Sequence, residues 1–547
     1  MSAVVDGDPG GRVSATVGTG VGLVVGPCGD AAFEPQPTMT AADSASAADS
    51  AGVVCLRRSV IRQILRAMGR MPCSEARIAH AIVRRPAAGT ARIGSVHRRM
   101  TAGPTSGSST SQLELGLGAA RLDIEPEWKA QQRLWGHSLH PMCSYLASFP
   151  AALTHAFIQR YSRPGDVILD PFSGRGTAPL EAVAEGRIGV GNDLNPFAHL
   201  LTAAKLEPPT EAEARTRATA LRLAFAGGAT SWLDRARAIQ ADPAAGGSAP
   251  VPVEVALAFR ERTFAQLLFL KEALDLEVPV DRFIAAAVAG ILHGKTPSYL
   301  STLMPNTFSM APRYVRDFAA RTRFESPDRD AFDRLDAKLT RLFRDPPPRT
   351  PGVALLGDAR DAGARASTAL RARRLPDRAR LVLTSPPYLR VLKYGYYNWL
   401  RAWFLGFDSK VIDASLDDAH RRAPYLQFLR EVMRDLRPAL TDDGIAVFVI
   451  GDVATDRGRA TPDGLGLAER VWEEAARPEG FRLAGIADDD VHAHRKMTKL
   501  WGREAGRATQ VDRILVLAAT ESGRRRATSA ASLPVDWAWP PRRLRAL

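Results

Sequence analysis

Short apolar runs of strand length recur in two separate parts of the chain. In the first part, the runs at 167–169 and 188–190 are each followed by a helical pattern, over 178–185 and 197–205. In the second part, comparable runs occur at 353–356, 381–383, 445–450, 481–486 and 513–518. Strands that alternate with helices are typical of α/β proteins with a mostly parallel sheet. The pattern therefore predicts an α/β fold with a sheet of roughly seven strands.

The two parts are separated by residues 207–350, which follow a mostly helical pattern and are rich in alanine and arginine. No run of strand length is evident there, so the sequence predicts an inserted helical module. Within it, the stretch 292–314 interleaves lysine, hydroxyl, amide and aromatic side chains, which suits contacts with phosphates and stacking on bases. This stretch is either a target-recognition surface or a loop that packs on the core through Leu300, Met304 and Phe308.

Both ends of the chain differ from these parts. Residues 1–125 are rich in glycine, alanine, serine and threonine and poor in aromatics, so they bury too little apolar surface to offset chain entropy. We expect a low-complexity, mostly disordered N-terminal tail, with a solvated helix over 53–70 as its exception. At the other end, the arginines at 524–526 and 542–543 indicate a basic, mobile C-terminal tail over 523–547.

The chain carries a formal net charge of +14 over 547 residues. This excess suits attraction to a polyanion such as DNA or RNA, and it suits an arginine-rich proteome almost as well. The four cysteines show no C-x-x-C spacing, so they indicate neither a disulfide framework nor a zinc site and fit a reducing cytoplasm. No apolar run reaches the length of a membrane span, and the run at 21–25 lacks the basic leader of a signal peptide. We therefore expect a cytoplasmic protein that contacts no membrane.

A tight glycine turn follows the first predicted strand. Asp170 stands at the carboxyl end of that strand, and the turn over 173–176 leads into the next helix. Glycines let a ligand approach the backbone, and the helix N-terminus offers free N–H groups. Asp193 ends the second predicted strand about 20 positions later, where an acidic residue holds a ribose through its hydroxyls. The unit predicts a nucleotide-type cofactor at this edge of the sheet.

The fourth predicted strand ends at Thr384 and is followed by Ser385, Pro386, Pro387 and Tyr388. Two prolines lock φ and remove two N–H donors, which leaves a stiff backbone that presents carbonyl acceptors. The Ser385 side chain and the Pro386 carbonyl can accept the two N–H groups of an exocyclic base amine and free its lone pair for attack on a methyl donor. Tyr388 offers a face on which an extruded base can stack. The alternative is a plain strand-ending turn, and the aromatics over 394–399 either wall the base pocket or pack in the core.

These two motifs together resemble a known family. The segment Asp170-Pro-Phe-Ser-Gly-Arg-Gly-Thr177 is similar to the S-adenosylmethionine motif of the amino-directed DNA methyltransferases, which methylate cytosine N4 or adenine N6. The segment Thr384-Ser-Pro-Pro-Tyr388 is similar to their other diagnostic motif. The resemblance covers residues 135–206 and 351–520. It implies a seven-stranded, Rossmann-like class I methyltransferase sheet built from two parts, 126–206 on the cofactor side and 351–522 with the catalytic motif.

The resemblance also implies S-adenosylmethionine as the cofactor and a role for each site residue. Asp193 would hold the ribose, and Asp358 would meet the adenine, unless Asp358 only caps the helix that starts after it. The stretch 137–150 would close over the methionine end, with His137 and His140 as packed loop residues rather than metal ligands. The target base would be held by Ser385, Pro386, Pro387 and Tyr388, and no metal is implied. The cofactor would also be bound by Asp170, Phe172, Ser173, Gly174, Gly176 and Thr177.

In the resembled family, a serine at the first position of the second motif usually accompanies cytosine N4, and an acidic residue there usually accompanies adenine N6. Ser385 therefore favours methylation of cytosine N4 in DNA, as in restriction–modification systems. One alternative is an RNA amino-methyltransferase acting on guanine N2 or cytidine N4. Another is a non-catalytic nucleic-acid-binding regulator, against which the intact second motif argues. The long insertion departs from the family's common arrangement, and Arg175 stands where a small residue is more usual, so no recognition sequence or oligomeric state is implied.

Overall fold

The computed structural model describes residues 121–132, 134–145, 149–246, 251–304, 309–387, 393–416, 421–452, 465–490 and 511–539. All of them belong to one compact unit of the chain, 91–547. The predicted N-terminal tail lies outside the described residues up to position 120, and so do Phe308 and Tyr388.

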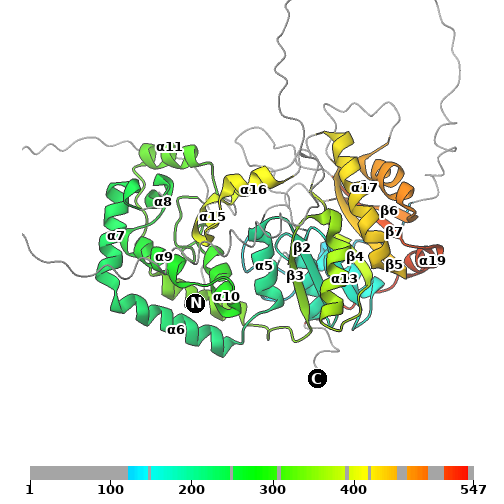
Figure 1. Ribbon diagram of the computed structural model, residues 1–547, viewed down its shortest axis with the longest axis horizontal. Helices are drawn as coiled ribbons and strands as arrows, with labels where there is room; N and C mark the ends of the chain where they lie inside the picture. The colour runs from blue at the N-terminus through cyan, green and yellow to red at the C-terminus, as the bar shows by residue number, and fades with distance from the viewer. Residues whose placement is uncertain are drawn as a thin grey trace, which may run out of the picture. The chain divides into compact units, whose positions relative to one another are not determined.

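This unit contains a seven-stranded sheet with the order β3-β2-β1-β4-β5-β7-β6, seen on the right of Figure 1. Strands β1 to β5 are parallel to one another, and β7 is antiparallel to both β5 and β6. All seven predicted strands are confirmed, and the order is that of a Rossmann-like class I methyltransferase sheet. The strands are β1 (Val167–Asp170), β2 (Ile188–Asp193), β3 (Gly352–Leu356), β4 (Ala379–Thr384), β5 (Leu440–Asp452), β6 (Arg482–Asp490) and β7 (Val511–Ala518).

The strand order reverses at β1, which pairs with β2 on one side and with β4 on the other. In open α/β sheets, ligands bind outside the carboxyl ends of the strands at such a switch point. The glycine turn follows β1 directly, and the S-P-P motif follows β4. The topology thus places both motifs at the same edge of the sheet.

Helices cover both faces of the sheet. On one face, α13 (Ala362–Ala372), α17 (Arg422–Ala439), α18 (Leu467–Arg470) and the π-helix η6 (Val471–Ala476) pack against Leu169 and Phe448. On the other face, α3 (Ala151–Tyr161), α4 (Thr177–Ala184) and α19 (Glu521–Ala530) pack against Ile168 and Val447. Successive residues of a strand therefore enter different layers. This explains why the strands are continuous apolar runs in the sequence.

The chain between β2 and β3 is helical, and its described residues contain no strand beyond an isolated bridge between His293 and Ser301. Helix α6 begins with a capping box in which Thr210 and Glu213 bond each other's backbone N–H. Leu300 and Met304 are fully buried, so the packing alternative holds for these two residues. The helices are α5 (Pro196–Leu206), α6 (Glu211–Gly227), α7 (Ala229–Ala241), α8 (Val253–Ala258), α9 (Glu261–Ala273), α10 (Pro279–Ala289), α11 (Pro312–Thr322) and α12 (Ala331–Leu342).

Short helices connect the remaining parts. After the S-P-P motif come α14 (Tyr394–Tyr397), α15 (Trp399–Leu405) and α16 (Ser409–Ser415). Short helical turns are η2 (Glu127–Ala130), η3 (Pro243–Gly246), η4 (Ala359–Asp361) and η7 (Arg477–Glu479). None of the helices among the described residues is long and apolar enough to cross a membrane.

The prediction of a mobile basic tail over 523–547 is wrong for its described part, residues 523–539. Helix α19 packs through Ala527 and Ala530, which are buried against the sheet. Arg526 donates hydrogen bonds to the carbonyl oxygens of Tyr161 (3.0 Å) and Asp443 (2.8 Å). Because the arginines dominate this sequence, the sequence pattern does not predict a helix here. The small residues of α19 form the face that packs on the strands.

Candidate cofactor and catalytic site

The glycine turn after β1 depends on its glycines. Gly174 and Gly176 both have positive φ, at 50° and 74°, a region that side chains with a Cβ disfavour. A Cβ on Gly176 would lie 2.8 Å from the hydroxyl oxygen of Thr202 and 3.0 Å from its Cα. Helix α5 thus approaches the turn so closely that only glycine fits at position 176.

Helix α5 also fixes the turn through polar side chains. The Lys205 ammonium donates to the Arg175 carbonyl oxygen at 2.5 Å, and the hydroxyls of Ser173 and Thr202 are hydrogen-bonded at 3.1 Å. Lys205 is fully buried. Burial, and to a lesser extent the Arg175 charge, lowers its pKa well below the usual value. Helix α5 therefore holds the turn through two hydrogen bonds.

Asp193 joins the end of β2 to the same turn. Its carboxylate accepts the Gly174 N–H at 2.8 Å through Oδ2 and the Asn195 N–H at 2.9 Å through Oδ1. Burial raises the pKa of Asp193 to about 6, against the opposing effect of these backbone hydrogen bonds. The carboxylate is thus adjacent to the glycine turn, where the sequence predicted a ribose-binding acid.

Asp358 follows β3 and caps η4. Its carboxylate accepts the Arg360 N–H at 2.9 Å and the Arg360 guanidinium at 2.9 Å, so the capping alternative is confirmed. The guanidinium of Arg360 also lies over the Phe428 ring, 4.7 Å from its centroid. Phe428 in turn contacts Phe172 of the glycine turn, with ring centroids 5.8 Å apart. An adenine contact for Asp358 stays a prediction, and an incoming adenine amine would compete with Arg360.

The two motifs meet through Asp170 and Thr384. The Thr384 hydroxyl donates to Asp170 Oδ1 at 2.6 Å, and the Phe172 N–H donates to the same oxygen at 3.1 Å. Asp170 is 2% exposed, and burial raises its pKa to about 7. The carboxyl end of β1 is thereby fastened to the carboxyl end of β4.

Ser385 is half-buried at the start of the second motif, and Pro386 is buried. The Ser385 hydroxyl donates its proton to the Val449 carbonyl oxygen of β5 at 3.1 Å. A hydroxyl group that donates in one direction keeps its lone pairs as acceptors. Tyr388, the predicted stacking residue, lies outside the described residues.

Tyr145 and Tyr394 were not assigned individual roles from the sequence. Their rings stack with centroids 5.6 Å apart and planes inclined by 18°. Tyr145 lies in the stretch 137–150, and Tyr394 begins α14 after the second motif. The sequence shows an aromatic residue in each of these two stretches, but it does not show that the two rings stack, because their pairing depends on the tertiary fold.

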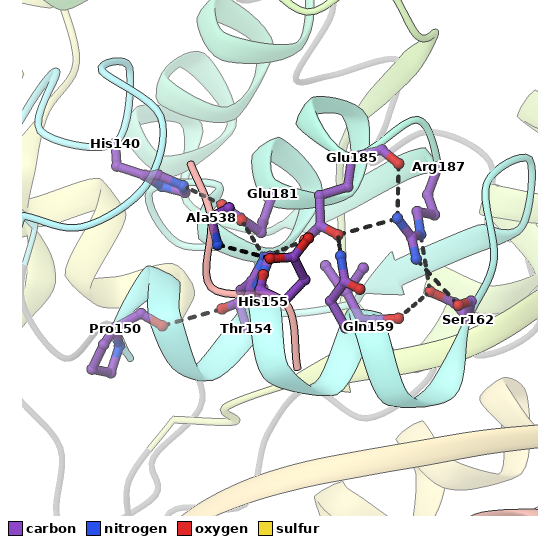
Figure 2. Close-up of polar contacts among 12 residues, drawn as sticks. His140, Pro150, Thr154, His155, Gln159, Ser162, Glu181, Glu185, Arg187 and Ala538 are labelled. Carbon is purple, nitrogen blue, oxygen red and sulfur yellow. Dashed lines mark hydrogen bonds and ion pairs between the residues drawn. The ribbon is translucent and has the colours of Figure 1, made fainter. Parts of the chain in front are cut away.

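Figure 2 shows a buried network around His140 and His155. His140 is hydrogen-bonded to Glu181 at 2.7 Å, and His137 contacts the Pro346 carbonyl oxygen at 3.1 Å. His137 and His140 are therefore packed loop residues, which was the predicted alternative to metal ligation. Among the described residues, His155, Glu181 and Glu185 form the group whose ligand atoms lie within 4.8 Å of one another.

The geometry of that group suits a protonated histidine. His155 Nδ1 faces carboxylate oxygens of Glu185 at 2.7 Å and Glu181 at 3.1 Å, and Nε2 faces the Asp536 carbonyl oxygen at 2.8 Å. Both ring nitrogens therefore face acceptors, and only an imidazolium carries two donors. Burial lowers the pKa of His155, but the hydrogen bonds with Glu181 and Glu185 outweigh it and raise the pKa to about 10.

Comparison with known proteins identifies the segment that carries the glycine turn. Residues 120–204 match the family model of N6/N4 DNA methylases. Type II methyltransferase M.MjaII from Methanocaldococcus jannaschii is 35% identical over 71 residues, which are 13% of this chain and 13% of that protein. Type II methyltransferase M.XycI from Xanthomonas campestris pv. cyanopsidis is 35% identical over 78 residues, 14% of this chain and 26% of that protein. The resemblance to the amino-directed DNA methyltransferases is confirmed.

A solved structure gives a weaker likeness. TrmN from Thermus thermophilus overlaps with a TM-score of 0.25 at 12% sequence identity, over 69% of this chain and 51% of that chain. A score this low supports no argument. The methyltransferase resemblance therefore depends on the matched segment and on the strand order of the sheet.

The methyltransferase family and the fold imply S-adenosylmethionine as the methyl donor, and the residues at this edge fit that cofactor. The glycine turn presents bare backbone, and the acidic Asp193 lies beside it. The Asn192 side chain ties the turn to the end of β3 by donating to Pro171 (3.2 Å) and Gly357 (2.9 Å) carbonyl oxygens. Its amide oxygen is buried and has no hydrogen-bond partner within the described structure.

Proposed function

We propose that this chain transfers the methyl group of S-adenosylmethionine to an exocyclic amino group of a DNA base, with cytosine N4 as the favoured target. The observation that carries the proposal is the 2.6 Å hydrogen bond from Thr384 to Asp170. It joins the strand end that leads into the glycine turn to the strand end that leads into the S-P-P motif. Methyl transfer needs donor and acceptor held side by side in one orientation.

The chemistry assigned to Ser385 agrees with its hydrogen bond. Because its hydroxyl proton is directed to the Val449 carbonyl oxygen, its lone pairs can accept an N–H from the target amine. The Pro386 carbonyl can accept the second N–H, which frees the nitrogen lone pair. Bound S-adenosylmethionine supplies an electrophilic methyl group: the N–C bond forms, the S–C bond breaks, and sulfur keeps its electron pair. The nitrogen then loses one proton to solvent.

Two features favour DNA and cytosine N4 over the alternatives. The matched family model is that of DNA methylases, and the similar proteins are named type II methyltransferases. Ser385 replaces the acidic residue that usually accompanies adenine N6 in the resembled family. Cytosine N4 in DNA is therefore the first substrate to test, and adenine N6 the second.

The test is transfer of labelled methyl groups to duplex DNA, single-stranded DNA and RNA, followed by mass spectrometry of the released nucleosides. We expect N4-methylcytosine from DNA. Label found only in RNA would show that the substrate is RNA rather than DNA. N6-methyladenine would show that the target base is adenine rather than cytosine. Cofactor binding without any methyl transfer would favour a non-catalytic regulator. In the same assay, Ser385→Ala should lower the rate roughly 100-fold by removing an acceptor that acts on the reacting amine.

Two further variants separate cofactor binding from catalysis. Asp193→Ala should weaken binding of S-adenosylmethionine about tenfold, because a buried acceptor for the ribose is removed. Ser415→Ala is the matched control for Ser385→Ala, since the Ser415 hydroxyl also donates to a backbone carbonyl oxygen, that of Ile412 at 2.8 Å. Equal rates for Ser385→Ala and wild type would remove Ser385 from the reaction, and equal cofactor affinity for Asp193→Ala would remove the ribose assignment.

A further inference from the structure

Two tyrosines from the two halves of the sheet domain meet beside the glycine turn. Tyr145 precedes α3, and Tyr394 begins α14 after the second motif. Their rings are nearly parallel, with centroids 5.6 Å apart. Both rings are half-buried. Tyr145 also packs on Phe197 of the core, with ring centroids 5.8 Å apart, so the stacked pair extends from the core to this edge of the sheet.

Tyr145 is fixed to the cofactor side of this edge. Its hydroxyl oxygen accepts a hydrogen bond from the Asn195 side-chain amide at 3.0 Å, and the Asn195 N–H is bonded to Asp193. A Cβ on Gly174 would lie 3.5 Å from ring carbon Cε1 of Tyr145, so the ring faces the turn at the distance of one added methyl group. A ligand placed on this turn must therefore pass next to Tyr145.

Tyr394 is fixed from the catalytic side. The N–H groups of Gly395 and Tyr396 donate to the Asp413 carboxylate of α16 at 2.7 and 2.9 Å, which anchors the first turn of α14. Burial and then the negative charge of Asp193 raise the pKa of both Tyr145 and Tyr394 above the usual tyrosine value. Both phenols are therefore neutral at neutral pH, and both lie close enough to the Asp193 carboxylate for its charge to affect their pKa.

We propose that Tyr145 and Tyr394 are positioning residues that form an aromatic wall for the cationic sulfonium end of S-adenosylmethionine. This inference rests on the proposed function. An aromatic ring attracts a cation through its electron-rich face, and the attraction grows where water is excluded. Because one ring comes from each half of the domain, the wall fixes the methyl donor relative to both halves at once. An error of about 1 Å in such placement costs roughly 100-fold in rate.

The test compares binding of S-adenosylmethionine with binding of S-adenosylhomocysteine, which has the same adenosine and amino acid but a neutral sulfur. Isothermal titration calorimetry on the full chain gives both Kd values for wild type, Tyr145→Leu, Tyr394→Leu and the double variant. We expect each single variant to lose about tenfold in affinity for S-adenosylmethionine and less than threefold for S-adenosylhomocysteine, since cation–π attraction is lost only for the cation. The double variant should lose less than the product of the single losses, because the rings act as a pair.

Two controls separate positioning from packing. Tyr145→Phe keeps the ring and removes only the hydroxyl, so it should retain most of the preference for the sulfonium. Tyr396→Leu removes a tyrosine from the same short helix, but that ring contacts Tyr397 rather than Tyr145, so both Kd values should stay at wild type. Equal losses for the two ligands, or no loss, would overturn the aromatic wall. A wild type that binds S-adenosylmethionine but methylates no base would overturn only the proposed function, and a wild type that binds neither ligand would overturn both.

Discussion

Burial makes the charged form of the Asp170 carboxyl group less favourable than its neutral form. Burial raises its pKa to about 7, above the unfolded value of about 3.8. The folded state therefore binds a proton more tightly than the unfolded state. The contribution of this group to stability is full below pH 4 and is lost as the pH rises through 7. At pH 8, the charged carboxylate destabilises the fold.

Asp170→Asn should raise stability at pH 8 and weaken cofactor binding. Both observed hydrogen bonds, from Thr384 and Phe172, end on Oδ1, and an asparagine oxygen can accept both. We expect the free energy of unfolding at pH 8 to rise by roughly 2 kcal/mol, and its fall between pH 5 and 8 to become smaller. Affinity for S-adenosylmethionine should drop about tenfold because a negative charge is lost at the site. Urea unfolding at both pH values and calorimetric binding check this, and lower stability at pH 8 would contradict it.

Single residues differ in how much of their role could be predicted from the sequence. The cap formed by Asp358 was among the predicted alternatives because its partner, the Arg360 N–H, lies two positions away. The contacts of Tyr145 were not predictable, because Asn195 and Tyr394 reach it only through the tertiary fold. Hydrogen bonds between residues close in sequence can be inferred from the sequence. Contacts that build a site depend on elements far apart in the chain.

At the scale of elements, the network in Figure 2 fastens α3, α4 and the segment after α19 together. His155 comes from α3, Glu181 from α4 and Glu185 from its C-terminal cap, while the acceptor on the other side is the Asp536 carbonyl oxygen. Glu185 is also paired with Arg187 at 3.1 Å. Because α4 starts directly after the glycine turn, this network also holds the helix that follows the turn in place.

The stability of this network should depend on pH in a defined direction. The folded pKa of His155, about 10, lies above the usual histidine pKa of 6.5, so its contribution is full below pH 6.5 and is lost as the pH rises through 10. His155→Gln should lower the free energy of unfolding at pH 7 by roughly 3 kcal/mol, because it removes the cation between the buried Glu181 and Glu185, of which only Glu185 keeps a second cation, Arg187. It should also flatten the decline between pH 7 and 10, as measured by urea unfolding.

The control is His199→Gln on α5. Burial and the nearby Arg282 lower the pKa of His199 to about 4, so this histidine is neutral throughout the range tested. Its replacement should leave the slope of stability between pH 7 and 10 as in wild type. A wild-type slope in His155→Gln as well would show that His155 is not the group that titrates.

The elements themselves were predictable where apolar runs are continuous, and less so where polar residues continue a strand. Strand β5 begins at Leu440, five positions before the predicted 445. The intervening Thr441, Asp442, Asp443 and Gly444 resemble a turn in isolation. They form a bulge between two pairs with β4, Leu440 with Ala379 and Ile445 with Leu381, and Asp442 within the bulge is ion-paired with Arg378 at 3.1 Å. Pairing resumes beyond the bulge at Leu440, which local preference alone does not reveal.

At the scale of the whole described unit, the helical insertion shares one apolar core with helices α4, α5 and α15 beside the sheet. Phe197 of α5 and Trp399 of α15 belong to the same buried cluster as Phe264 and Phe283 of the insertion. The sequence predicted an inserted helical module from the absence of strand patterns over 207–350. Its joint core could not be predicted, because an apolar helix face does not reveal which partner it will contact.

Polar side chains reinforce that joint core around α15. Arg401 is 1% exposed, and it donates to the Ala289 carbonyl oxygen of α10 at 3.3 Å and to the Asn398 side chain at 2.9 Å. Lys271 of α9 donates to the Trp403 carbonyl oxygen at 2.5 Å. The Trp399 indole donates to the Met310 carbonyl oxygen at 2.7 Å. The insertion therefore positions the helices that follow the S-P-P motif.

This shared core predicts that insertion and sheet unfold together. In hydrogen exchange measured by mass spectrometry at rising urea concentration, peptides from α9 and α10 should lose protection in the same transition as peptides from β4 and β5. Arg401→Met fills the space but leaves the Ala289 carbonyl oxygen unpaired, so it should lower the opening free energy of both sets by a similar amount, roughly 2 kcal/mol. Opening of α9 and α10 alone, with β4 and β5 unchanged, would mean that the insertion folds as a separate unit. In that case α15 would be free to move relative to the sheet, and the aromatic wall would have lost its support on the catalytic side.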